Sequence, residues 1–299
     1  MRHQIQRAVL IGLHVAVAVG ADACLPPPGV ACGNEWCSDQ ERCVSLGPDV
    51  AGQQLVCVTQ TIGKSCMVDT DCAPAVLCDT RLCRVARSCA EILLHFPGSV
   101  DGVYTIAPGT TMPFSAVCDM TRDGGGWTLL LKATDKAILG YSASAWTDAS
   151  LLNATELNTQ PGDAKYQSFL SLPVTTLRGE LDGFTYTKDF ASMTPQKIFA
   201  GSSDVAFDFS NFNWGQSKWS TQPHCQIFGV NTPYEHARTR FGWSANEQGN
   251  CDNNDTAIGL GLMVESSGGS SHGAGYECLV APCNQGIVNT GGNGLLWGK

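Results

Sequence analysis

The residues best suited to chemistry in this chain form an acidic and amide-rich run near position 250. Calcium takes about six to eight oxygen ligands, which the carboxylates, side-chain amides and backbone carbonyls of one loop can supply. The alternative is a turn in which the Asp and Asn side chains hydrogen-bond their own backbone. Both interpretations stand, and calcium is the candidate cofactor. The candidate site is the run from Glu247 to Asp255.

Aromatic side chains offer a second kind of chemistry, because a flat apolar face with a polar edge suits a sugar ring. Trp214, Trp219 and Trp243 are the candidates, although burial in a core is the commoner fate of tryptophan. The sequence has neither the H-E-x-x-H pattern of zinc proteases nor the phosphate-binding G-x(4)-G-K-[ST] loop. Its histidines beyond residue 23 show no metal-ligand or triad spacing. We therefore predict that the protein is not an enzyme.

The composition limits the classes of protein to which the chain can belong. The net charge of −9 argues against a nucleic-acid binder, since such proteins normally present a basic face. Charged residues make up only 15% of the chain and 33 residues are glycine, which is typical of a loop-rich extracellular protein. Fifteen cysteines favour an oxidising compartment, where disulfides persist.

The first 23 residues have the pattern of an export signal. Arg2, His3 and Arg7 precede an apolar stretch over 8–20, and small residues follow at 21 and 23. This stretch is shorter than the roughly 20 residues of a membrane-spanning helix, and no later segment is apolar enough to span. We predict a signal peptide over residues 1–23 and a secreted or cell-surface protein.

Cys24 would then begin the mature chain, which is the position of the lipid acceptor in bacterial lipoproteins. The even number of the other cysteines favours lipidation, because fourteen can all pair. Ala21 and Asp22 fit the usual acceptor sequence poorly, so plain secretion is preferred over a lipid anchor at Cys24.

Residues 24–88 form a segment that needs covalent support. It has nine cysteines and a single aromatic residue, so it cannot bury enough apolar surface to fold by itself. It lacks the C-x2-C pairs and histidines of structural zinc sites, which leaves disulfides of about 2–4 kcal/mol each to stabilise it. We predict four disulfides from two similar quartets, namely Cys32, Cys37, Cys43 and Cys57, then Cys66, Cys72, Cys78 and Cys83.

A glycine-rich corner follows this module. Residues 116–118 and 127–131 read as short strands on either side of a polar turn that begins at Asp119 and ends in Gly124, Gly125 and Gly126. Three consecutive glycines are entropically costly, so they indicate positive φ or a very close approach of the backbone. Trp127 directly after them is expected to be a buried anchor. The alternative is an ordinary hairpin with a glycine-rich loop.

The run from Cys118 to Leu129 resembles the signature of the fibrinogen-like domain: Cys-Asp, four residues, then Gly-Gly-Gly-Trp-Thr-Leu. Segments 88–93 and 101–106 resemble the opening of fibrinogen C-terminal and intelectin domains, and the looser likeness beyond residue 131 is closest to bacterial members. The resemblance implies that residues 89–299 form an α+β fibrinogen-like domain with a central antiparallel sheet, short helices and long loops. It also implies a disulfide between Cys89 and Cys118.

The same resemblance implies where a ligand binds. Fibrinogen-like domains bind calcium through a D-x-D loop near the ligand pocket, and the matching positions here are Asp252 and Asn254, with Asp255 adding charge. The amide at the second position and a missing double tryptophan depart from the pattern. Intelectins bind a carbohydrate diol with His and Glu in the region after this loop, and solvated loop residues are the alternative. The candidates for ligand binding are His272, Tyr276 and Glu277, with Trp243.

The remaining cysteines pair most economically as Cys225–Cys251 and Cys278–Cys283. Strands are expected at 127–132, 197–200, 204–209 and 257–264, and short helices at 149–157 and 168–172. The Gly/Ser/Asn-rich region 266–294 is expected to form mobile loops.

These patterns predict an exported, non-enzymatic binding protein that recognises glycans or acetylated surface groups in a lectin-like manner, assisted by calcium. Its expected partner is a glycan or another cell-surface ligand, with no nucleic acid and no transmembrane segment. The alternative is a structural or adhesion protein that uses the fibrinogen-like domain for protein–protein contact.

Overall fold

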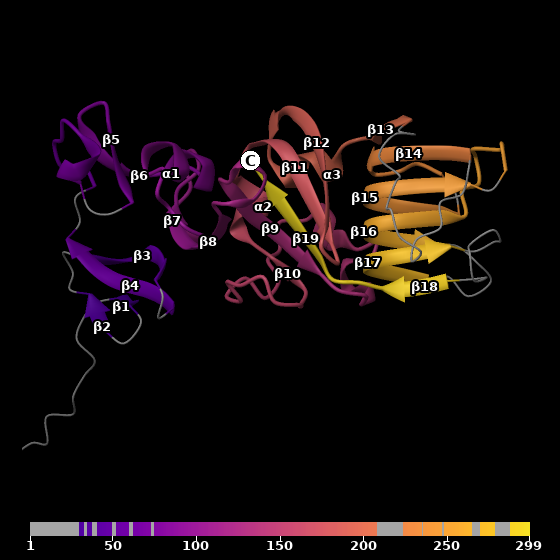
Figure 1. The fold of residues 1–299 in the computed structure, drawn as a ribbon, viewed down its shortest axis with the longest axis horizontal. Coiled ribbons are helices and arrows are strands. Elements are labelled where there is room, and N and C mark those ends of the chain that lie inside the picture. The colour runs from indigo at the N-terminus through magenta and orange to yellow at the C-terminus, as the bar shows by residue number, and fades with distance from the viewer. Residues whose placement is uncertain are drawn as a thin grey trace, which may run out of the picture.

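A computed structural model of the chain describes residues 30–32, 35–37, 41–49, 52–59, 62–72, 75–207, 224–234, 236–246, 248–264, 270–278 and 288–299. It consists mostly of antiparallel β-sheets, with a few short helices and a disulfide-rich N-terminal region. Figure 1 shows small N-terminal hairpins, then a seven-stranded sheet, then a six-stranded sheet along the long axis. The predicted signal peptide and Cys24, Trp214, Trp219, Glu247 and Cys283 lie outside the described residues.

Three two-stranded sheets form the described part of the predicted cysteine module. Two disulfides, Cys66–Cys78 and Cys72–Cys83, pair the second quartet around η1 (Asp69–Asp71). Three of these sulfurs lie within 4.8 Å of one another, but as disulfides they are not the thiolates that zinc binds. The strands are β1 (Val30–Cys32), β2 (Glu35–Cys37), β3 (Glu41–Asp49), β4 (Gly52–Thr59), β5 (Val76–Asp79) and β6 (Leu82–Val85).

The predicted boundary at residue 88 lies next to α1 (Cys89–His95). Leu77 from β5 and Ile92 from α1 belong to one buried cluster, so the hairpin β5–β6 packs on the helix. The Arg84 guanidinium donates to both carboxylate oxygens of Glu91 at 3.0 and 2.5 Å. The two sides of this boundary are therefore packed together rather than separated by an open linker.

The seven-stranded sheet has the strand order β12-β11-β19-β9-β8-β7, with β10 paired to β9. Its centre is completed by β19, which lies antiparallel between β9 and β11. Segments that are more than 100 residues apart in sequence are thereby neighbours in one sheet. The strands are β7 (Gly102–Ile106), β8 (Phe114–Asp119), β9 (Trp127–Ala133), β10 (Ala164–Lys165), β11 (Val174–Leu181), β12 (Phe184–Met193) and β19 (Gly294–Gly298).

The six-stranded sheet is an antiparallel meander in sequence order from β13 to β18. Phe241 and Ile258 of this sheet belong to the same buried cluster as Leu131 and Leu177 of the seven-stranded sheet, so the two sheets share a core. The strands are β13 (Asp204–Phe207), β14 (His224–Val230), β15 (Ala237–Asn246), β16 (Thr256–Val264), β17 (Ser270–Cys278) and β18 (Val288–Gly291).

Two of the predicted strands and helices are wrong, and the others are present where the structure describes them. Residues 197–200 lie in α3 (Pro195–Ala200) rather than in a strand, because Pro195 favours the first turn of a helix and Ile198 and Phe199 are buried on one side. Residues 149–157 contain no helix and form turns, whereas α2 (Gln167–Ser171) matches the other predicted helix. The strands predicted at 127–132 and 257–264 are present as β9 and β16.

The region 266–294 is not a set of mobile loops in its described part, because it contributes β17, β18 and the start of β19. A Cβ on Gly242 would lie 2.0 Å from the carbonyl oxygen of Ile258, and one on Gly259 would lie 2.3 Å from that of Phe241. Glycine there permits a close approach of neighbouring strands. The glycines opposite one another across the sheet are Gly229, Gly242, Gly259, Gly275 and Gly291.

Candidate functional site

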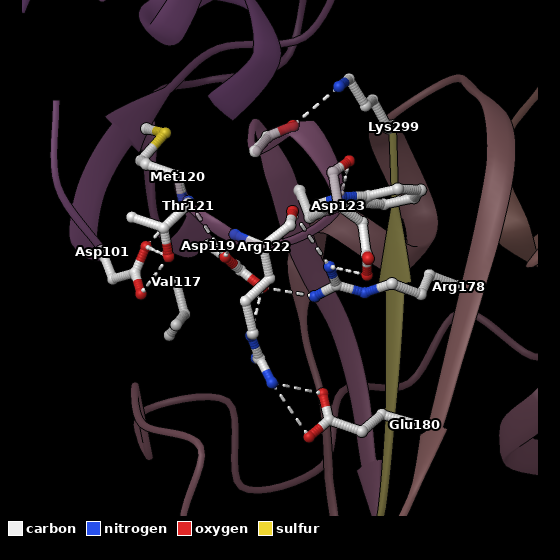
Figure 2. A network of polar contacts seen from close by, with 12 residues as sticks. Asp101, Val117, Asp119, Met120, Thr121, Arg122, Asp123, Arg178, Glu180 and Lys299 are labelled. Atoms are coloured by element: carbon white, nitrogen blue, oxygen red, sulfur yellow. Dashed lines mark hydrogen bonds and ion pairs between the residues drawn. The ribbon is translucent and has the colours of Figure 1, made fainter. Parts of the chain in front are cut away.

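The glycine-rich corner turns the chain between β8 and β9 (Figure 2). The three glycines at 124–126 have φ values of 79°, 64° and 76°. A Cβ on Gly125 would lie 2.0 Å from the carbonyl oxygen of Met120, and one on Gly126 would lie 2.8 Å from the Cα of Ala90. Positive φ and close approach, the two reasons for glycine predicted from the sequence, are both confirmed.

Trp127 and a disulfide fix this corner in the fold. The Trp127 side chain is buried directly after the third glycine, which confirms its predicted role as an anchor. The disulfide between Cys89 and Cys118 is present, and it joins the first residue of α1 to β8. The bridge therefore holds the helix that carries Ala90 against Gly126.

A buried arginine that the sequence analysis missed lies beside the corner. Arg178 on β11 is fully buried, and its Nη2 donates to Asp119 Oδ2 at 2.5 Å. The guanidinium carbon is 4.7 Å from the ring centroid of Trp127 and 5.1 Å from that of Trp297, so the cation lies between two indole rings. A buried charge needs such partners, because its transfer out of water is costly.

Asp119 is the centre of the polar network at the corner (Figure 2). Its carboxylate accepts hydrogen bonds from the backbone N–H of Thr121 and of Arg122, and from the side chains of Arg122 and Arg178. Arg122 Nη1 also lies 3.1 Å from both carboxylate oxygens of Glu180. The motif carboxylate therefore positions two arginines in the fold.

The electrostatics of Asp119 predict a loss of stability in acid. Burial alone would raise the pKa of Asp119, but hydrogen bonds from Arg122 and Arg178 and their positive charges lower it below the ordinary 3.8. A carboxyl whose pKa is lower in the folded state than in the unfolded state stabilises the fold. This stabilisation is complete at pH values above the unfolded-state pKa of about 3.9, and it is lost as the pH falls through the lower pKa of the folded state. We expect the free energy of unfolding to fall below about pH 4.

Asp119→Asn is expected to show a smaller decline over that range, because the amide does not titrate. Urea unfolding at several pH values between about 3 and 7 measures this decline for both proteins. Equal slopes in acid for the variant and the parent would contradict the assignment of the effect to Asp119.

The predicted calcium segment connects β15 to β16 in the other sheet. The predicted disulfide Cys225–Cys251 is present and ties this segment to β14. Asp252 is exposed, whereas Asn254 and Asp255 are buried where the chain enters β16. The three described candidate ligands thus lie at one end of the six-stranded sheet.

Two buried amides at this end have oxygen atoms without a hydrogen-bond donor among the described residues: Oδ1 of Asn246 and Oδ1 of Asn254. Asn254 Nδ2 donates to Cys225 O at 3.3 Å, and Asn246 Nδ2 donates to Asn250 O at 2.5 Å. Backbone carbonyls only accept, so these contacts fix which end of each amide is oxygen. An unpaired buried polar atom costs roughly 1–3 kcal/mol, and a bound cation would offset that cost.

The Asx-turn alternative accounts for one part of the segment. Asn250 Oδ1 accepts a hydrogen bond from the backbone N–H of Asp252 at 3.3 Å. This contact uses neither of the unpaired oxygens of Asn246 and Asn254, so the turn leaves both of them without a donor among the described residues. The residues present therefore fit a hard cation such as calcium.

The predicted ligand-binding residues do not come together around this loop. Tyr276 and Trp243 are buried in the shared core, which for Trp243 is the alternative that the sequence left open. His272 is five residues before Glu277 on β17, about 17 Å along the strand, and its Nδ1 lies 2.7 Å from Asp135 O. The backbone of Glu277 pairs with Ala257 beside the loop, and its side chain lies outside the described residues, as does the predicted Cys278–Cys283 bridge.

The sequence also contains one enzyme-like spacing, which the histidine and motif patterns did not indicate. Residues 269–273 read Gly-Ser-Ser-His-Gly, which matches the G-x-S-x-G pattern of a nucleophile elbow. That motif requires a sharp turn from a strand into a helix, but Ser271 and His272 lie within β17. Ser271 Oγ donates to the carbonyl of Leu262 at 3.3 Å.

A scan of the chain against models of protein families finds no match. Among the described residues, no helix is long and apolar enough to cross a membrane.

Proposed function

We propose that this chain is an exported, non-enzymatic binding protein with a fibrinogen-like domain at residues 89–299, and that it recognises a glycan or another surface group with the help of calcium. The observation that carries the proposal is the pair of buried, unpaired amide oxygens of Asn246 and Asn254 at the end of the six-stranded sheet. The resemblance of the glycine-rich corner to the fibrinogen-like signature supports it independently.

The residues that would hold calcium are Asn246, Asp252, Asn254 and Asp255. When bound, the ion would supply a positive charge that takes hydroxyl or carbonyl oxygens of a ligand as further ligands. The disulfide Cys225–Cys251 restrains the loop and so reduces the entropy lost on binding.

Calcium is expected to raise the thermal stability of the folded chain, because an ion that binds only the folded state stabilises it by mass action. The gain is about 2.7 kcal/mol at a concentration near 100 times Kd. Asp252→Ala removes an exposed carboxylate and is expected to weaken calcium binding about tenfold or more, with little effect on the metal-free fold. Calorimetric titration and thermal unfolding with and without EDTA measure both effects.

Asp189→Ala, which removes an exposed carboxylate on β12, is the matched control and should bind calcium like the parent. A titration without heat and without a shift in melting temperature would remove calcium from the proposal. A glycan array probed with and without chelator then separates the functions. Binding that EDTA abolishes supports calcium-assisted recognition, and a blank array favours adhesion through protein–protein contact.

A further inference from the structure

A buried lysine of the seven-stranded sheet lies against an amide and a carboxylate that come from one loop. Lys132 is on β9, and its side chain is 1% exposed. Its backbone pairs with Ala164 of β10, so the loop that precedes β10 returns across the lysine. From that loop, Asn158 Oδ1 lies 3.1 Å and Glu156 Oε2 lies 3.6 Å from Lys132 Nζ. An amine, an amide carbon and a proton acceptor are thus brought together.

The amide of Asn158 is oriented for attack by this amine. Besides Lys132 Nζ, the backbone N–H of Gln160 donates to Asn158 Oδ1 at 3.0 Å. Both neighbours only donate, which fixes this end of the amide as the oxygen. A hydrogen-bond donor at this position stabilises the negative charge that develops on a carbonyl oxygen under attack. The Asn158 Nδ2 group is at the exposed end of the site and donates to no residue that the structure describes, so it is free to leave.

We propose that Lys132 and Asn158 form an isopeptide bond within the folded chain. A primary amide reacts slowly with an amine in water, but an amine held beside it can reach an effective concentration of about 10⁵–10⁸ M. Lys132 is held in this way, because its stem is packed in the sheet and its Nζ also donates to Gln160 O at 3.2 Å. Asn158 Cγ is one bond of about 1.2 Å from Oδ1, so a small rotation of the exposed side chain brings it to the amine.

The reaction balances without a co-reactant. Glu156 accepts a proton from the Lys132 ammonium, and the neutral Nζ attacks Cγ of Asn158. The Nζ–Cγ bond forms as an electron pair of the carbonyl moves onto Oδ1, next to the Gln160 N–H. When that pair returns, the Cγ–Nδ2 bond breaks and Nδ2 leaves as ammonia. The Nζ atom gives up two protons in all, of which one leaves with the ammonia and the other passes through Glu156 to the solvent.

The bond would join an exposed loop covalently to the middle of the sheet. Lys132 and Asn158 are 26 positions apart, and a cross-link between them restrains the unfolded chain as a disulfide does. Unlike the disulfides of this protein, the link resists reducing agents, since no sulfur takes part. It is also separate from the loop 246–255 and requires no calcium.

The test is a tryptic digest of the purified full-length chain after reduction, followed by mass spectrometry. A linked Lys132 resists trypsin, so peptide 123–136 is expected joined to 137–165, lighter by the about 17 Da of ammonia. An unlinked chain gives 123–132, 133–136 and 137–165 as separate peptides. No cysteine lies in 123–165, so a disulfide cannot join them. We expect the joined peptide from most molecules. Separate peptides as the main product overturn the proposal and leave Lys132 as an ionic anchor of the loop.

Glu156→Gln keeps the size of the side chain but cannot take up the proton, so the link is expected to form at least about a hundredfold more slowly. The unlinked variant should also melt about 5–10 °C below the parent. Thr155→Ala, an exposed position in the same loop, is the matched control and should be linked as fully as the parent. A Glu156→Gln chain that is linked as fast as the parent overturns the role of Glu156. The digest of the parent decides the link itself, whatever the stability of the variants.

Discussion

Asp119→Ala is expected to lower the free energy of unfolding by about 3–5 kcal/mol, because it leaves the Arg178 guanidinium buried without its carboxylate. Arg178 is fully buried, and its Nε already has no acceptor among the described residues. Among those residues, no second buried carboxylate pairs with the Arg178 guanidinium and could replace Asp119. Asp123, the other carboxylate near it at 3.2 Å, has a half-exposed side chain and is a weaker partner. Urea unfolding monitored by circular dichroism measures the loss.

A double variant separates the stranded charge from the loss of packing. Asp119→Ala/Arg178→Met is expected to be more stable than Asp119→Ala alone, because methionine fills the space between the two indole rings without a charge. Asp204→Ala removes a half-exposed carboxylate paired with Lys188 (3.2 Å) and should lose less than about 1 kcal/mol. If Asp119→Ala were no more destabilising than Asp204→Ala, the buried ion pair would not be the element that stabilises the corner.

Gly125→Ala is expected to lower the free energy of unfolding by about 2–5 kcal/mol. One part arises from the backbone, since φ at Gly125 is 64° and alanine resists that region. The larger part is steric, because the new methyl group would lie 2.0 Å from the carbonyl oxygen of Met120 and 2.8 Å from Cδ2 of Leu93. Thermal and urea unfolding of the purified variant measure the sum.

Gly124→Ala is the matched control, because φ at Gly124 is 79° but the nearest atom to an added Cβ is Lys299 Nζ at 4.0 Å. It should lose only the backbone part, about 1–2 kcal/mol. The difference between the two variants therefore isolates the close approach of Met120 to the corner. Equal losses would show that the conformation of the turn matters and its packing does not.

Local patterns predicted those parts of the fold that depend on neighbouring residues. The glycine triplet indicated positive φ and close approach, and both are present at 124–126. The apolar runs at 127–132 and 257–264 indicated buried strands, and they form β9 and β16. The pairing of Cys225 with Cys251 followed from the count of the remaining cysteines, and the structure contains it.

Contacts between distant segments could not be predicted in this way. The glycines from Gly229 to Gly291 lie in five neighbouring strands, although glycine in a sequence usually indicates a loop. They allow the strands to approach closely only because the register of the sheet places one glycine of each strand opposite the next. Likewise, the resemblance to intelectins made Tyr276 and His272 candidate ligand residues. In the structure, Tyr276 is buried in the shared core, and His272 lies far along β17 from the oxygen-rich loop.

The chain by itself determined which positions require glycine, which cysteines are available to pair and which stretches are apolar enough to be strands, because φ preference, covalent chemistry and hydropathy are properties of single residues and their neighbours. Only the tertiary structure decided that Arg178 meets Asp119 between Trp127 and Trp297, and that a cavity opens beside them. These groups come from β8, β9, β11 and β19, and the insertion of β19 between β9 and β11 brings them together. The free energy that selects this arrangement comes from burial over the whole sheet, which no local pattern contains.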